Sequence, residues 1–191
     1  MRDLALALLV AYGLVAFVLR ALIQVRLTGS TGLKGISGSP GSLEWLGGVL
    51  FAGSIAVSVV GAVVGGGDGV PVAGAVLAVG GLLATAGAQL AMGESWRVGV
   101  DPGERTELVT AGPFALVRNP IYAGMIPFFI GIALLVPNAL TIAGAVLLVV
   151  ALEIQTRLVE EPYLRGVHGS AYADYAARVG RFLPGVGRLR R

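Results

Sequence analysis

A short motif in the middle of the chain joins three residues suited to holding an anion, Arg118, Asn119 and Pro120. Proline is favoured at the first position of a helix, so we expect a helix to begin at Pro120. The N–H groups and the dipole at a helix start attract negative charge, and the Arg118 guanidinium adds a fork that matches a carboxylate or a phosphate. The motif therefore predicts an anion site, unless Arg118 serves only as a positive residue at the cytoplasmic end of a membrane helix.

Two adjacent carboxylates, Glu160 and Glu161, follow the last long apolar stretch. Carboxylates at the end of a membrane helix are costly unless they have partners. Arg157 can pair with Glu153 or with Glu161, since each lies four residues away. The two acids are therefore either part of a polar site or part of a solvated helix face. Further along, one face of a predicted helix carries Tyr172, Tyr175 and Val179.

Composition indicates what kind of protein must position these groups. Of the 191 residues, 55% are hydrophobic and 13% are charged, whereas a soluble domain carries about 25% charged residues. The 30 glycines lie within apolar runs, which excludes a disordered or collagen-like chain. We infer an all-α integral membrane protein, in which glycine allows helices to approach closely.

Several kinds of site and partner are excluded. The chain has no cysteine, so disulfides, thiolate metal sites and cysteine nucleophiles are absent. The single histidine, His168, has no second histidine and no cysteine with which to form a metal site, so we expect no metal. The net charge of +3 is too small to indicate nucleic acid as a partner.

The membrane helices can be read from the apolar runs, because a spanning helix needs about 20 mostly apolar residues. Such runs occupy residues 4–25, 43–64, 70–92 and 121–154. The last run is interrupted at Pro137-Asn138, a pair that favours a turn. We therefore predict five transmembrane helices, of which the last two form a helical hairpin. Residues 1–92 hold the first three helices, and residues 93–191 form a catalytic half with a linker, the hairpin and a C-terminal helical segment.

The basic residues predict the orientation of these helices. Apart from Arg2 and Arg20, at the edge of the first helix, all basic residues fall on one side of the predicted membrane. Because that side faces the cytoplasm, we predict an outer N-terminus and a cytoplasmic C-terminus, in the cell membrane of a prokaryote. The two polar cytoplasmic segments, 93–119 and 155–191, hold seven of the eleven acids.

Two motifs together resemble a known family. The first reads Leu-Val-Thr-x-Gly-Pro-Phe-x-x-Val-Arg-Asn-Pro-x-Tyr-x-Gly from Leu108, and the second reads Glu-Glu-x-x-Leu-x-x-x-x-Gly-x-x-Tyr-x-x-Tyr-x-x-Arg-Val from Glu160. Their pairing, with a helical hairpin between them, is similar to the isoprenylcysteine carboxyl methyltransferases. That superfamily also includes membrane phospholipid methyltransferases and small-thiol methyltransferases. The resemblance covers about residues 106–184.

The resemblance implies methyl transfer from S-adenosylmethionine, in a pocket closed by the C-terminal segment. It implies that Arg118, Asn119 and Glu161 are catalytic residues, with Tyr175 close by. The acceptor is expected to be a lipophilic or small carboxylate, thiol or lipid that enters through the bilayer. Carried over by position, the cofactor-binding residues are Leu108, Val109, Gly112, Phe114, Arg118, Asn119, Pro120, Tyr122, Glu160 and Leu164.

Two departures from the family pattern leave alternatives open. Asn119 and Thr106 stand where relatives often have histidine, and asparagine cannot titrate near neutral pH. The alternatives are a membrane reductase that uses a nicotinamide cofactor and a scaffold without catalysis. Trp96 is interpreted either as an interfacial anchor or, together with Arg97, as part of the acceptor entrance.

Overall fold

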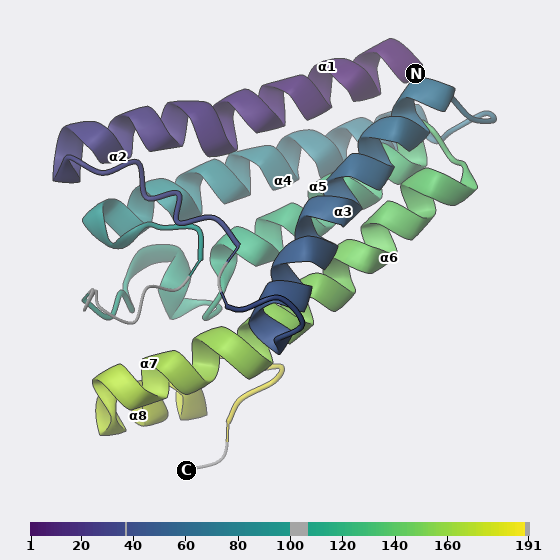
Figure 1. Cartoon of the computed structure of the whole chain (residues 1–191). Helices are drawn as coiled ribbons and strands as arrows, with labels where there is room; N and C mark the ends of the chain where they lie inside the picture. Colours follow the sequence, from purple (N-terminus) through teal and green to yellow (C-terminus); the bar gives the residue numbers. More distant parts are fainter. Residues whose placement is uncertain (37, 100–106, 190–191) are drawn as a thin grey trace.

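The computed structural model describes residues 1–36, 38–99 and 107–189, which form helices and contain no β-strand (Figure 1). The first helical stretch consists of α1 (Arg2–Gly13), a π-helical segment η1 (Leu14–Leu19) and α2 (Arg20–Thr28). The remaining elements are α3 (Leu43–Val64), α4 (Pro71–Met92), the 3-10 segments η2 (Gly93–Ser95) and η3 (Gly112–Ala115), α5 (Pro120–Leu135), α6 (Ala139–Ile154), a second π-helical segment η4 (Gln155–Glu160), α7 (Glu161–His168) and α8 (Ser170–Arg178).

Four stretches among the described residues are long and apolar enough to cross a membrane. They are Arg2–Thr28, Leu43–Val64, Pro71–Ser95 and Ala139–His168. The predicted fifth, α5, is apolar but has 16 residues, because it begins at Pro120 and ends just before Pro137. An all-helical protein with four candidate spans is therefore established, while the crossing of α5 stays a prediction.

The helices pack in two close pairs, α4 along α5 and α3 along α6 (Figure 1). A Cβ at Gly81 of α4 would come within 2.5 Å of the Phe128 nitrogen in α5. A Cβ at Gly144 of α6 would come within 2.1 Å of the Ser58 Oγ in α3. Glycine at these two positions therefore sets the distance between the paired helices.

Asn138, in the turn between α5 and α6, joins two helix ends. Its Oδ1 accepts hydrogen bonds from the backbone N–H groups of Leu140 (2.9 Å) and Thr141 (3.0 Å), which caps the start of α6. Its Nδ2 donates to the carbonyls of Gly61 and Gly65, both at 2.9 Å, where α3 ends. A single side chain thus satisfies backbone groups of both helices, at the end of the bundle near the N-terminus (Figure 1).

The opposite end of the bundle positions the polar motifs. There α3 and α5 begin, α4 and α6 end, and α6 continues through η4 into α7 and α8 (Figure 1). The apolar core reaches this end through Tyr12, whose ring centroid lies 4.2 Å from that of Phe128. The first helical stretch, α1 with η1 and α2, therefore packs against α5 through this ring contact.

Candidate functional site

A cavity of about 370 Å³ lies at the end of the bundle where α3 and α5 begin and α4 and α6 end. One part of its wall is apolar and comes from the membrane helices, and the other part is polar. The apolar part includes Tyr12, Phe17, Phe51, Met125 and Leu152, and the polar part includes Arg97, Asn119, Tyr122, Gln155 and Glu160. Such a cavity can hold a polar ligand beside an apolar one.

Nine of the ten predicted cofactor-binding residues line this cavity. They are Leu108, Val109, Phe114, Arg118, Asn119, Pro120, Tyr122, Glu160 and Leu164. Gly112 is not among the lining residues. With φ of +60°, it makes the turn that begins η3 and leads to Phe114. Thr106 lies outside the described residues.

The polar wall is centred on the Glu160 carboxylate. Glu160 shares one helical face with Tyr163 and Leu164, because residues three and four apart lie side by side, and all three line the cavity. The Tyr122 hydroxyl donates a hydrogen bond to Glu160 Oε1. The Arg97 guanidinium carbon lies 5.3 Å from the Tyr163 ring centroid. A carboxylate, two phenol rings and a guanidinium therefore meet in one wall.

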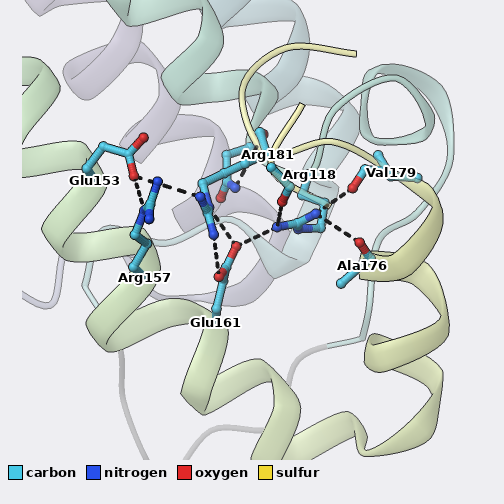
Figure 2. Close-up of polar contacts among 9 residues, drawn as sticks. Arg118, Glu153, Arg157, Glu161, Ala176, Val179 and Arg181 are labelled. Atoms are coloured by element: carbon cyan, nitrogen blue, oxygen red, sulfur yellow. Dashed lines mark hydrogen bonds and ion pairs between the residues drawn. The ribbon is translucent and has the colours of Figure 1, made fainter. Parts of the chain in front are cut away.

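Glu161 faces away from the cavity, although it is the next residue. Its Oε1 accepts from Arg118 at 2.6 Å and from Arg181 at 2.9 Å, and its Oε2 accepts from Arg181 at 3.0 Å (Figure 2). Arg157 pairs with Glu153 rather than with Glu161, because the Glu161 carboxylate is already held by two arginines. The structure thus places Glu160 at the predicted site, whereas Glu161 belongs to a buried ion-pair cluster with Arg118 and Arg181.

Arg118 belongs mainly to this cluster, although it also lines the cavity. Its side chain is 1% exposed, and its two terminal nitrogens donate to four acceptors. Besides Glu161, these are the carbonyls of Ala176, Val179 and Gly187 (Figure 2). The guanidinium therefore fastens the start of α5 to the segment after α8, and its terminal N–H groups point at protein acceptors. Donation to the Glu161 carboxylate raises the pKa of Arg181 above its ordinary value.

A roof formed by α8 and the residues after it covers the cavity wall. Tyr172 and Tyr175 are buried with Ala176, and Leu108 and Leu164 of the cavity wall pack against them. Burial raises the pKa values of both tyrosine hydroxyls. The Tyr175 hydroxyl donates to the Phe114 carbonyl at 2.6 Å. The predicted shared face is confirmed for Tyr172 and Tyr175 of α8, whereas Val179 lies just after α8 in extended backbone and packs against the same cluster.

Sequence reasoning missed the cavity residues from other parts of the chain. They include Tyr12 of α1, Phe17 of η1 and Phe51 of α3. These elements carry no motif. Tyr163 was detectable, since it lies three residues after Glu160 on the same helical face. Trp96 and Arg97, interpreted above as an anchor or an entrance, both line the cavity.

Comparison with known proteins identifies the family. The phospholipid methyltransferase family matches residues 70–171, from the start of α4 to the start of α8. Among curated proteins, none matches the chain significantly. The family match confirms the resemblance carried by the two motifs. It includes all of the first motif and the second motif as far as Ala171. Since the match covers more than half of the chain, the protein belongs to the phospholipid methyltransferase family, a family of membrane methyltransferases.

Proposed function

We propose that the protein transfers a methyl group from S-adenosylmethionine to a lipophilic or small acceptor, and that the transfer takes place in the cavity at the end of α4 and α6. The observation that carries this proposal is the gathering of nine predicted cofactor residues around one cavity. Family membership supports the reaction class. The cofactor, the acceptor and the role of each residue are our inferences.

The residues of the polar wall fit the chemical groups of S-adenosylmethionine. The Glu160 carboxylate suits an ammonium group or ribose hydroxyls, and the Arg97 guanidinium suits a carboxylate. Phe114 and Tyr163 offer aromatic rings for adenine or for a sulfonium. When bound, the cofactor supplies an electrophilic methyl group on a positively charged sulfur.

Arg118 and Glu161 are proposed as positioning residues. Both were expected to act directly in the site, Arg118 on the cofactor carboxylate. The Arg118 terminal nitrogens instead donate to Glu161 and to roof carbonyls. We infer that the pair acts by holding the roof over Leu108 and Leu164, and that Arg97 is the cation for the carboxylate.

The contribution of the chain to the reaction is alignment and exclusion of water. Asn119 lines the cavity and cannot act as a base near neutral pH. A displacement at a methyl group needs an aligned nucleophile and a dry site more than it needs proton transfer, if the nucleophile is already anionic or soft. Asn119 is therefore compatible with catalysis and serves as a hydrogen-bonding residue.

The apolar wall suits the acceptor. Phe17, Phe51 and Leu152 belong to membrane helices, so a lipophilic acceptor can reach them from the bilayer while the cofactor arrives from the polar end. The orientation predicted from the basic residues places this polar end in the cytoplasm.

Cofactor binding by the purified protein in detergent tests the proposal. We expect calorimetric titration to detect S-adenosylmethionine and no nicotinamide cofactor. Glu160→Gln should weaken the binding about tenfold, as loss of one charge-assisted hydrogen bond does. Asp68→Asn, an exposed carboxylate in the loop before α4, is the matched control and should leave binding unchanged.

The competing activities give different results in the same titration. Binding of a nicotinamide cofactor alone would favour the reductase and overturn the methyltransferase. If neither cofactor binds, the chain is better described as a scaffold. If S-adenosylmethionine binds, transfer of its labelled methyl group into a whole-membrane extract would identify the acceptor class.

A further inference from the structure

Arg20 is a buried charge in the first membrane helix that the proposed reaction does not use. It is 2% exposed and lies within the candidate span Arg2–Thr28. A charged residue within a membrane span is costly and normally has a function. Arg20 does not line the cavity, so any effect on the site must pass through the residues it contacts.

The Arg20 guanidinium binds the C-terminal end of α4. Its Nε donates to the Gln89 carbonyl at 3.3 Å, and a terminal nitrogen donates to the Gly93 carbonyl. Carbonyl groups at a helix end lack helical partners and carry partial negative charge, so they favour a cation. Arg20 thereby binds carbonyl groups at the end of α4, just before the segment that carries Trp96 and Arg97.

Hydrogen bonds in both directions join the first helix to α4 at this level. Gln24 Nε2 donates to the Glu94 carbonyl at 2.7 Å. In return, Gln89 Nε2 donates to the Ala16 carbonyl at 3.0 Å, within the π-helical segment η1. A π-helical turn changes which side chains face inward, and it often occurs at functional sites. Here it directly precedes Arg20 and Gln24, the buried residues of α2.

The Arg20 guanidinium also lies against Trp96 of the cavity wall. Its central carbon is 4.6 Å from the ring centroid, which is the geometry of a cation–π contact. On the same indole, a Cβ at Gly32 would approach the ring carbons to 3.0 Å. The adjoining backbone is paired, because Val98 N–H donates to the Gly32 carbonyl at 2.8 Å. Trp96 is thus packed between Arg20 and the segment that precedes α3.

We propose that Arg20 is a positioning residue of the methyl-transfer site, which acts by holding Trp96 and, through it, Arg97 in the cavity wall. The inference rests on the proposed function, because it assigns the effect of Arg20 to ligand binding at that cavity. Arg97 contacts Tyr163 in the same polar wall, so a displaced Trp96 segment would separate the Arg97 guanidinium from that ring.

The test uses Trp96 as its own probe. The chain has two tryptophans, so Trp45→Phe leaves Trp96 as the only one. In that background we expect Arg20→Met to shift the emission spectrum of Trp96 and to weaken S-adenosylmethionine binding about tenfold. Arg20→Lys, which keeps the charge, should restore part of both. Arg26→Met, an exposed arginine of the same helix, should change neither.

Several outcomes would overturn the inference. One is a folded Arg20→Met variant with the parent spectrum and the parent affinity. Another is lower thermal stability with unchanged spectrum and affinity, because that result indicates a purely structural role. If Arg20→Met does not fold, Arg20→Gln, which removes the charge but keeps a hydrogen-bond donor, replaces it, and parent spectrum and affinity in that variant overturn the inference equally. Failure of the parent itself to bind the cofactor would overturn the proposed function, and this inference with it.

Discussion

Arg118, two residues before α5, and Glu161 at the start of α7 form a salt bridge of 2.6 Å, with side chains 1% and 9% exposed. The neighbouring Glu160 instead accepts a hydrogen bond from Tyr122 in the cavity wall. The two adjacent carboxylates therefore have different surroundings, since Glu161 is bound to arginines under the roof and Glu160 lies in the cavity wall. Their substitutions should have separable effects.

Glu161→Gln should mainly lower stability. Removal of the Glu161 charge leaves the buried Arg118 without its carboxylate and Arg181 with Glu153 alone, at 3.9 Å, and breaking a buried pair costs about 3–5 kcal/mol. We expect a clearly lower unfolding temperature in detergent, measured by circular dichroism. Asp68→Asn is the control. Parent stability in Glu161→Gln would show that the roof does not depend on this carboxylate.

Tyr122→Phe should weaken cofactor binding while the fold is kept. The hydroxyl orients the Glu160 carboxylate, and a hydrogen bond to a charged group contributes about 1.5–3 kcal/mol. We expect about tenfold weaker binding in calorimetric titration. Because Tyr122 acts through Glu160, the double variant with Glu160→Gln should bind no more weakly than Glu160→Gln alone. Additive losses would contradict this coupling.

Asn138→Ala should destabilise the end of the bundle far from the cavity. The change removes the cap of α6, which costs about 1 kcal/mol, and it leaves the Gly61 and Gly65 carbonyls without their Asn138 donors. We expect a lower unfolding temperature and, below it, parent cofactor affinity. Asn138→Asp, which keeps the acceptor for α6 but removes the donor to α3, should fall between parent and alanine.

Stability should decline at alkaline pH as buried tyrosines ionise. Burial raises the pKa of Tyr172 from 10.0 to about 12, so the folded state keeps this proton when the unfolded chain has lost it. The stabilisation is complete below pH 10 and is lost as pH rises through about 12, at about 1.4 kcal/mol per pH unit. Tyr172→Phe should reduce this slope in urea unfolding measured from pH 9 to 12. An unchanged slope would indicate that Tyr172 does not contribute.

Helix boundaries that depend on neighbouring residues are predicted well from the sequence. The run at residues 43–64 matches α3 because Ser42 caps its start, where its Oγ accepts from the Trp45 N–H at 3.2 Å. The start of α5 at Pro120 follows from proline geometry. The two motifs, read through the family resemblance, predict most of the cavity's polar wall.

What the sequence leaves open depends on packing between distant segments. Arg157 had two possible partners, and the choice of Glu153 follows from arginines that reach Glu161 from residues 118 and 181. The role of Arg20 depends on a carbonyl 73 residues away. Phe17 of η1 and Phe51 of α3 line the same cavity and pack against the same apolar core, and no local pattern indicates this.

Three of the four hydrogen-bond acceptors of Arg118 are synthesised late. Its acceptors at Ala176, Val179 and Gly187 lie 58, 61 and 69 residues further along the chain. A ribosome therefore completes every candidate membrane span before it makes these three carbonyls, whereas Glu161, the fourth acceptor, belongs to the last span. The helices can enter the bilayer first, and Arg118 can stay hydrated until the final segment docks. We therefore expect insertion of the helices to precede closure of the roof over the cavity.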